Sequence, residues 1–200
     1  MNHYFDSNEN LAHKQLTTKY AHKSEKFEFV TDIGVFSRNG VDRATDILLS
    51  CLPALSGKTL DFGCGFGVVG IVLSKLYGDK ITVFMSDVNN RALELARANA
   101  EKNKATATII NSDGFFNIPE NFDAIIQNPP IHAGKAVVYR LYEEAHGHLA
   151  PGGSFFVVVL KKHGALSHKK KLEELFGDGN CFVLHQKKGI FVFECRANQK

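Results

Sequence analysis

The chain has 200 residues, 44% of them hydrophobic, which is enough to bury a sizeable core in one domain. No run approaches about 18 consecutive apolar residues, and residues 1–15 lack the apolar segment of a secretory signal, so neither a membrane-spanning nor a secreted protein is expected. With a formal net charge of only +3, the composition is that of a globular cytoplasmic protein.

The cysteines give no sign of a metal site. They stand at Cys51, Cys64, Cys181 and Cys195, without a CxxC pair or another zinc-type spacing. Scattered cysteines in a cytoplasmic chain favour reduced thiols over disulfides or zinc ligands. We therefore expect no metal.

The hydrophobic pattern divides the chain into a lead-in and one domain. Residues 1–26 are polar and rich in Lys and His, and we expect them to form a helical or irregular N-terminal lead-in. Over 27–200, apolar strand-like runs alternate with amphipathic segments of helical length. The expected strands cover 27–31, 58–63, 80–87, 105–113, 122–127, 153–160, 180–186 and 189–196, and the expected helices cover 41–52, 67–77, 89–103, 135–149 and 168–177.

This alternation predicts an α/β fold of the doubly wound, Rossmann-like type. We expect a mostly parallel, seven-stranded sheet with helices on both faces and an antiparallel hairpin at the C-terminus. In such sheets a ligand binds beyond the carboxyl ends of the strands, where the strand order reverses. The segments expected at those ends are 61–67, 86–90, 111–115 and 127–131.

A glycine-rich loop, GCGFGVVG, leads from the strand at 58–63 into the next helix. Glycine permits positive φ and a close approach of the backbone to a ligand, and the helix N-terminus behind it offers unpaired N–H groups. Gly65, Gly67 and Gly70 match GxGxxG, so a dinucleotide site must be considered. The alternative is a tight turn that binds nothing.

Three carboxylates follow or precede the strand ends. Asp87 could accept hydrogen bonds from both hydroxyls of a ribose, or it could cap the following helix, a role for which Asn89 competes. Asp113 could accept from an adenine amine, with Gly114 and Phe115 lining the ring, or it could be an Asx-turn residue. Asp61 could approach an ammonium group, or it could be a buried structural residue held by loop amides.

The stretch QNPPIHAGK follows an apolar strand, and its two prolines cannot continue that strand or enter a helix interior. An exocyclic base amine is a weak nucleophile because its lone pair is delocalised into the ring. The side-chain carbonyl of Asn128 and the backbone carbonyl of Pro129 could accept its N–H groups and favour a pyramidal nitrogen, while Pro129 and Pro130 stiffen the loop. The alternative is a simple strand terminator.

Four segments, taken together, resemble a known family. TDIGVFSRNGVD, DFGCGFGVVG, SDVNNRALELARANA and NPPIHAGK stand in the order and spacing of the small-domain methyltransferases of class I. The closest similarity is to the catalytic domain of the ribosomal small-subunit guanine-N2 methyltransferases, and it spans about residues 25–195.

The resemblance implies an S-adenosylmethionine-dependent N-methyltransferase that modifies ribosomal RNA, preferably at guanine N2. The implied cofactor residues are Asp61, Gly63, Gly65 and Gly67 around the methionine part, Asp87 at the ribose, Asp113 at the adenine, and Asn128. The implied catalytic residues are Asn128, Pro129 and Pro130, which would hold the target amine. The implied substrate contacts are Phe36, Ser37, Ile131 and His132, although a plain loop residue is the favoured interpretation of His132.

The departures from the family keep the acceptor open. An aromatic residue often follows the two prolines, whereas Ile131 stands here, so stacking on an extruded base would have to come from Phe36 or another side chain. Related motifs also serve adenine amines and protein glutamine. A second domain found in some relatives does not fit into 200 residues, so docking would rely on the lead-in and the C-terminal surface.

The expected partner is ribosomal RNA or the assembled small subunit, without a membrane. From Ile131 onward the chain carries eleven Lys and Arg against six Asp and Glu, which is consistent with a polyanionic partner, although lysine runs are commonly just solvated. Two other functions remain open. A nicotinamide-dependent oxidoreductase would use the GxGxxG loop but leave the NPPI stretch unexplained, and a non-catalytic RNA-binding module would leave both unexplained.

Overall fold

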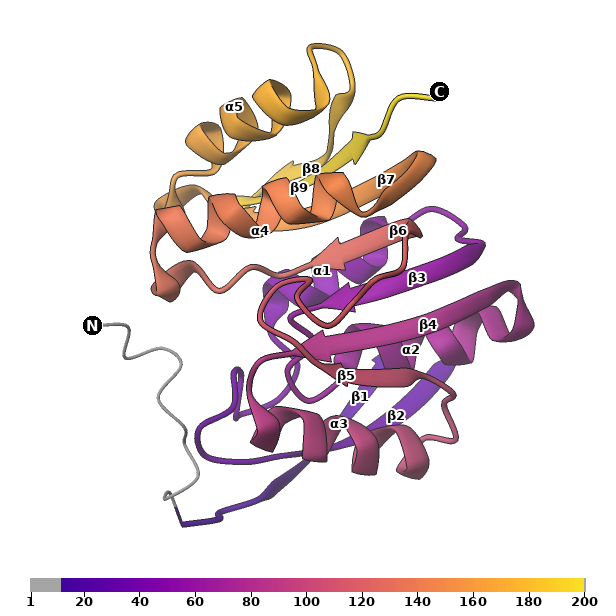
Figure 1. Cartoon of the computed structure of the whole chain (residues 1–200). Coiled ribbons are helices and arrows are strands. Elements are labelled where there is room, and N and C mark those ends of the chain that lie inside the picture. The colour runs from indigo at the N-terminus through magenta and orange to yellow at the C-terminus, as the bar shows by residue number, and fades with distance from the viewer. Residues whose placement is uncertain (1–11, 200) are drawn as a thin grey trace.

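The computed structural model describes residues 12–199, which form a twisted sheet between two layers of helices, with a separate hairpin beside it (Figure 1). The strands are β1 (Leu16–His22), β2 (Glu25–Thr31), β3 (Gly57–Phe62), β4 (Ile81–Asp87), β5 (Thr108–Asn111), β6 (Phe122–Gln127), β7 (Leu149–Leu160), β8 (Cys181–Lys187) and β9 (Ile190–Arg196). The helices are α1 (Arg43–Cys51), α2 (Val68–Tyr77), α3 (Asn90–Lys102), α4 (Lys135–Gly147) and α5 (Ala165–Phe176), with short 3₁₀ turns at Gly78–Lys80, Ile131–Ala133 and Lys161–His163.

The main sheet has seven strands in the order β5-β4-β3-β6-β7-β9-β8. The first five are parallel, whereas β9 runs antiparallel to both β7 and β8. The predicted fold class is therefore confirmed. The order reverses beside β3, so Phe62 at its end lies level with Ser86 of β4 and Gln127 of β6. The loops that follow these three strands meet at one place.

Two hydrophobic clusters fill the two faces of the sheet. The helices α1, α2 and α3 pack with β2 on one face, whereas α4 and α5 cover the other. Figure 1 shows α4 and α5 in front of the sheet and α1 and α2 behind it. The strands of the centre, such as the AII of β6, are apolar on both sides because both faces are covered.

The lead-in differs from the sequence prediction. Residues 1–11 lie outside the described residues, but 16–22 form β1, which pairs antiparallel with β2 along its whole length. The expectation of a helical or irregular segment is thus wrong for this part. Most side chains of β1 are exposed or half-buried, so the strand has hardly any apolar pattern to reveal it. The strand forms because its backbone pairs with that of β2.

Asn99 of α3 and Asn103, the residue that follows this helix, attach the hairpin to the domain. The Oδ1 of Asn99 accepts from Val30 N at 2.7 Å, and its Nδ2 donates to Val30 O at 2.8 Å and to Phe66 O at 2.9 Å. One turn later, Asn103 bonds the N–H and C=O of Glu28 at 3.0 and 2.9 Å. Side-chain amides thus satisfy the edge of β2 that β1 leaves free, and Asn99 is fully buried as it does so.

We predict that Asn99→Ala destabilises the protein by about 3 kcal/mol, because it leaves the N–H and C=O of partly buried Val30 and the C=O of buried Phe66 without a partner. Asn103→Ala is the matched control and should cost only about 1 kcal/mol, since water can replace its side chain at this partly exposed position. Urea unfolding of both variants gives the comparison. Equal small losses would contradict the anchoring role of Asn99.

Candidate active site

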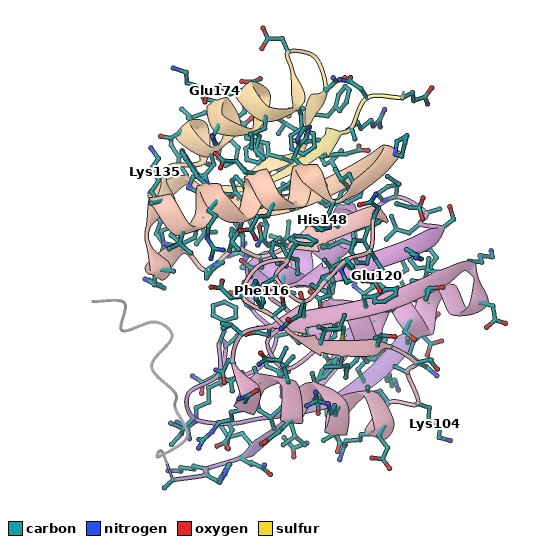
Figure 2. All side chains as sticks on the ribbon, in the orientation of Figure 1. Lys104, Phe116, Glu120, Lys135, His148 and Glu174 are labelled. Carbon is teal, nitrogen blue, oxygen red and sulfur yellow. The ribbon has the colours of Figure 1, made fainter. Side chains whose placement is uncertain are left out.

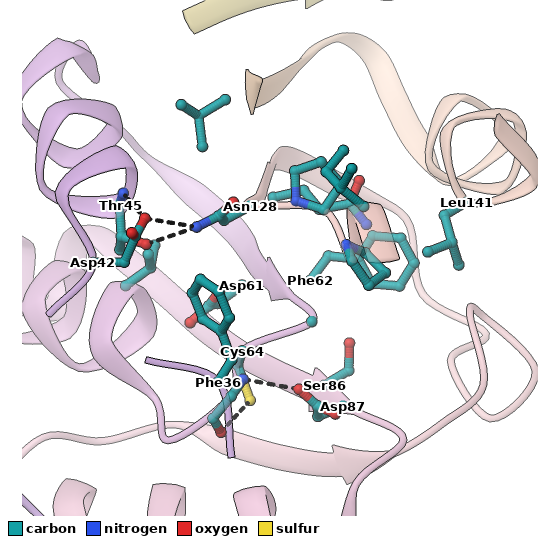
Figure 3. Close-up of a pocket in the computed structure, with 18 of the residues that line it drawn as sticks. Phe36, Asp42, Thr45, Asp61, Phe62, Cys64, Ser86, Asp87, Asn128 and Leu141 are labelled. Atoms are coloured by element: carbon teal, nitrogen blue, oxygen red, sulfur yellow. Dashed lines mark hydrogen bonds between the residues drawn. The ribbon is translucent and has the colours of Figure 1, made fainter. Parts of the chain in front are cut away.

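A pocket opens where the loops after β3, β4 and β6 meet, and most of the predicted site residues line it. They are Phe36, Ser37, Asp61, Gly63, Gly65, Asp87, Asp113, Asn128, Pro129, Pro130, Ile131 and His132. Figure 3 shows side chains from distant parts of the sequence facing this space. Gly67 and Phe115, which were also predicted to lie at the ligand, do not border the pocket.

The glycine loop presents bare backbone to the pocket. Gly63 and Gly65 have φ of +76° and +55°, and an added Cβ would meet nothing within 4 Å at either position. Glycine is required here for its conformation, and the surface it leaves is open to a ligand. Gly67, with φ of +91°, has another task. A Cβ there would press on Ile71 and Ala96, so Gly67 lets α2 approach α3.

Asp61 is a buried carboxylate, and one of its two oxygens accepts a hydrogen bond. Its Oδ2 accepts from Gly70 N at 2.8 Å, which agrees with a loop-holding role, while Oδ1 has no hydrogen bond within residues 12–199. Burial raises the pKa of Asp61 to about 7, the bond from Gly70 opposes the rise, and the charge of Asp87 adds to it. A cation at the pocket would relieve this burial cost.

Asp87 is fixed by loop amides and does not cap the next helix. Its Oδ2 accepts from Gly65 N at 2.8 Å and its Oδ1 from Asn89 N at 2.9 Å. Asn89 is the N-cap of α3, accepting from Arg91 N and Ala92 N. Burial of the carboxyl group raises the pKa of Asp87, against the hydrogen bonds that it accepts. Of the two residues considered as the cap of this helix, Asn89 is therefore the one that caps it.

Asp113 lines the far end of the pocket but is not a free carboxylate. Its Oδ1 accepts from Arg140 Nη2 at 2.7 Å, and Arg140 also bonds Glu144 at 2.8 Å. Gly114 borders the pocket as expected. Phe115 does not, because its ring packs into the core 4.6 Å from that of Phe62.

The segment after β6 turns sharply into the pocket. Pro129 O accepts from Ile131 N at 2.8 Å and Pro130 O from Ala133 N at 2.9 Å, which starts the short 3₁₀ turn at Ile131–Ala133. The carbonyl of Pro129 therefore has one of its two lone pairs engaged. His132 is exposed, and its ring lies 6.1 Å from that of His163.

Two residues that were not predicted from the sequence, Asp42 and Thr45, fix the orientation of Asn128. Its Nδ2 donates to Thr45 Oγ1 at 3.0 Å and to Asp42 Oδ2 at 3.3 Å (Figure 3). A carboxylate only accepts hydrogen bonds, so the amide nitrogen must face Asp42. The same Asp42 oxygen caps α1 by accepting from Ala44 N and Thr45 N. The side-chain oxygen of Asn128 is left without a partner among the described residues.

The segment before α1 crosses beside the glycine loop. Phe36 borders the pocket and remains 56% exposed, so its ring is available to a ligand. Ser37 has φ of +57°, unusual for a residue other than glycine, and its hydroxyl donates to Gly40 O at 2.6 Å. Asn89 Nδ2 donates to Gly34 O at 3.0 Å and thereby ties this segment to the start of α3.

In the described part of the chain, no cluster of three or more His, Cys, Asp or Glu is arranged to hold a metal ion. None of the described helices is long and apolar enough to cross a membrane.

The raised pKa of Asp61 predicts how stability depends on pH. Between the ordinary value of 3.8 and about 7 the folded state keeps the Asp61 proton and the unfolded state loses it, so the free energy of unfolding falls as pH rises through this window. Asp61→Asn keeps an acceptor for Gly70 and should flatten that part of the curve, whereas Asp79→Asn at an exposed position should not. Urea unfolding across the window tests this, and parallel curves for all three proteins would contradict it.

Comparison with known proteins identifies the family. The sequence matches the methyltransferase small domain family over residues 26–194. The uncharacterized protein YbxB of Bacillus subtilis (strain 168) is 37% identical over 199 residues, which cover 97% of this chain and 98% of that protein. The ribosomal RNA small subunit methyltransferase C of Hamiltonella defensa is 40% identical over 149 residues, covering 72% of this chain and 43% of the relative.

A solved structure agrees in fold. The T. thermophilus 16S rRNA N2 methyltransferase RsmC, in complex with AdoMet and guanosine, has a TM-score of 0.81 and 25% identity, covering 92% of this chain and 51% of that one. The chain thus spans about half the length of the named methyltransferases that it matches. The resemblance drawn from the sequence motifs is confirmed: the chain belongs to the methyltransferase small domain family.

Proposed function

We propose that this chain is an S-adenosylmethionine-dependent N-methyltransferase whose target is an exocyclic base amine of small-subunit ribosomal RNA, guanine N2 by preference. The observation that carries the proposal is the unpartnered carbonyl of Asn128, held toward a pocket that also contains the glycine loop and Asp87. The names of the relatives support the substrate class, because they describe ribosomal RNA methylation and, in one case, bound AdoMet and guanosine.

The residues of the pocket fit this cofactor. S-adenosylmethionine, when bound, supplies a methyl group already activated on a sulfonium sulfur. The open backbone at Gly63 and Gly65 would accommodate its methionine part, and the free oxygen of Asp61 would accept from its ammonium group. Asp87, already fixed by two backbone amides, would hold the ribose hydroxyls. Asp113 would serve the adenine amine with the oxygen that Arg140 leaves free.

The target amine would lie against Asn128. The Oδ1 of Asn128 would accept one N–H of the amine, and the second lone pair of the Pro129 carbonyl would accept the other. These fixed acceptors favour a pyramidal nitrogen, so its lone pair becomes available for attack. No general base is needed before transfer, since the methylated nitrogen is acidic and loses its proton afterwards. Phe36 and Ile131 would flank the base as apolar contacts.

The other functions fit less well. An oxidoreductase would not need the hydrogen-bonded Asn128, and the family assignment speaks against it. A purely RNA-binding module would have no use for the buried Asp61 under an open glycine loop. Adenine and protein glutamine remain alternative acceptors, because both present an N–H₂ group that the same two carbonyls would hold. The proposed setting is the cytoplasm, with ribosomal RNA or the assembled small subunit as partner.

We predict that the chain transfers labelled methyl from S-adenosylmethionine to unmodified small-subunit RNA or subunits, with the label recovered in N2-methylguanosine. Asn128→Ala should lose at least about a hundredfold in rate, because an aligned acceptor for the amine disappears. Stabilisation of the variant by S-adenosylhomocysteine is the control for an intact pocket. Absence of label from every RNA, despite such binding, would refute the ribosomal substrate and direct the search to protein glutamine.

A sharper prediction concerns the clamp on Asn128. Thr45→Val removes the hydroxyl that accepts from Nδ2 while keeping the shape of the side chain, and Thr45→Ser restores the hydroxyl. We expect Thr45→Val to lower kcat about tenfold with little change in the affinity for S-adenosylhomocysteine, since the misaligned amide affects only the target amine. Thr45→Ser should stay near wild type. If Thr45→Ser and Thr45→Val lose activity equally, packing rather than hydrogen bonding explains the effect.

A further inference from the structure

A second cavity adjoins the candidate active site. It lies between the first turns of α4 and α5 and is lined by Ile131, Lys135, Val138, His163, Gly164, Ser167 and His168. Ile131 and His163 border both cavities, so a ligand in one lies beside a ligand in the other. The proposed methyl transfer makes no use of this second cavity.

The lining of this cavity is basic. It contains a lysine and two histidines and no Asp or Glu. The nearby carboxylates are engaged elsewhere, since Glu143 pairs with Lys171 at 2.5 Å and Glu173 pairs with Lys169. Burial lowers the pKa of His163, and the positive charges of Lys162 and His132 lower it further. The electrostatic environment is therefore one that favours an anion.

His168 is a largely buried side chain that offers this cavity a donor without a protein partner among the described residues. The residue is 3% exposed, and its Nδ1 lies 2.9 Å from the phenol oxygen of Tyr142, which is fully buried. Tyr142 has no other hydrogen-bond partner among residues 12–199, and we assign its O–H as the donor to Nδ1, because the reverse direction would leave the buried O–H without an acceptor. The ring proton then stands on Nε2, which has no partner in the same range.

The charge state of His168 supports this assignment. Burial lowers its pKa to about 4, and the charges of Lys135 and His163 contribute. At neutral pH the ring is uncharged and acts as an N–H donor of fixed orientation. Because His168 lines the cavity, this N–H is available to an acceptor bound there.

The two helices add to the same effect. Both begin after a glycine, Gly134 for α4 and Gly164 for α5, and neither has a side-chain cap. Figure 1 shows that the two helices start on the same side of the domain, and Figure 2 shows Lys135 projecting from the start of α4. Their first-turn N–H groups and the positive ends of their dipoles therefore lie near the cavity.

We propose that this second cavity binds a backbone phosphate of the RNA strand, next to the nucleotide whose base enters the active site. Its donors would be Lys135 Nζ, Ser167 Oγ and His168 Nε2–H. The inference rests on the proposed RNA substrate and names where the strand is held. It also gives the chain a phosphate contact of its own, at the rim of the pocket, that would orient the target base.

The test uses a fluorescent single-stranded RNA pentamer with a central guanosine, and versions in which one phosphate at a time is an uncharged methylphosphonate. Binding is measured by anisotropy with S-adenosylhomocysteine present. Lys135→Gln and Ser167→Ala, both at exposed positions, should weaken binding of the parent pentamer about tenfold and about threefold. Lys135→Gln should also reduce the salt dependence, the slope of log K against log salt, by about 0.7. Lys80→Gln makes the same charge change at the opposite ends of the strands, and it should alter neither the affinity for the pentamer nor its salt dependence.

The decisive comparison combines variant and probe. At one position beside the guanosine, methylphosphonate should weaken wild-type binding about tenfold but should not weaken Lys135→Gln further, as expected for two partners of one contact. Additive losses at every position, no loss at all, or failure of the pentamer to bind would overturn the proposal. If this coupling appears but the pentamer is never methylated, the phosphate site stands and the proposed function fails. If the pentamer is methylated but the losses from Lys135→Gln and from the methylphosphonate are additive, the proposed function stands and the phosphate site fails.

Discussion

The candidate site depends above all on the hydrogen bonds that hold the amide of Asn128. Asp42 and Thr45 belong to the start of α1, on one face of the sheet, and Asn128 follows the central strand β6. Because a carboxylate only accepts, the amide nitrogen faces α1 and its oxygen faces away from these two partners. Asp42 also caps α1, so the beginning of the helix and the orientation of the amide are set together. Loss of either partner would free the amide to rotate.

The second constraint is electrostatic. Asp61 and Asp87 lie close together beneath the glycine loop, and burial raises the pKa of both. Backbone amides of Gly70, Gly65 and Asn89 offset part of this cost. A ligand with an ammonium group and vicinal hydroxyls would satisfy the remaining oxygens of both carboxylates. Arg140 relieves the third carboxylate, Asp113, at the more exposed end of the pocket.

Local patterns revealed most of the fold and about half of the site. The apolar runs of β3, β4 and β6 are short-range signals, and so are the glycines of the loop, of which Gly63 and Gly65 border the pocket and Gly67 does not. Partners far apart in sequence left no such signal. Asp42 and Asn128 are separated by 86 positions, and Asp113 and Arg140 by 27. Asp42 could be read only as a helix cap, because nothing in the sequence says which strand end faces that helix.

The hairpin shows another limit of sequence patterns. Strand β1 is recognised through its polar, alternating side chains only once β2 is known to lie beside it. Asn99 reads as an odd polar residue on the apolar side of α3, and the structure gives its reason, since it satisfies backbone groups of β2 and of the glycine loop. Packing around Gly67 and Phe115 likewise decides which residues of a motif reach the pocket and which support it.

The most direct test is a crystal structure of the chain with S-adenosylhomocysteine and guanosine. We expect the guanine N2 to lie within about 3 Å of Asn128 Oδ1, the length of an N–H···O hydrogen bond, with Nδ2 still bonded to Thr45 and Asp42. The ribose of the cofactor product should contact Asp87. A guanosine bound elsewhere, or an Asn128 turned so that its nitrogen faces the base, would contradict the account of how this chain holds its target.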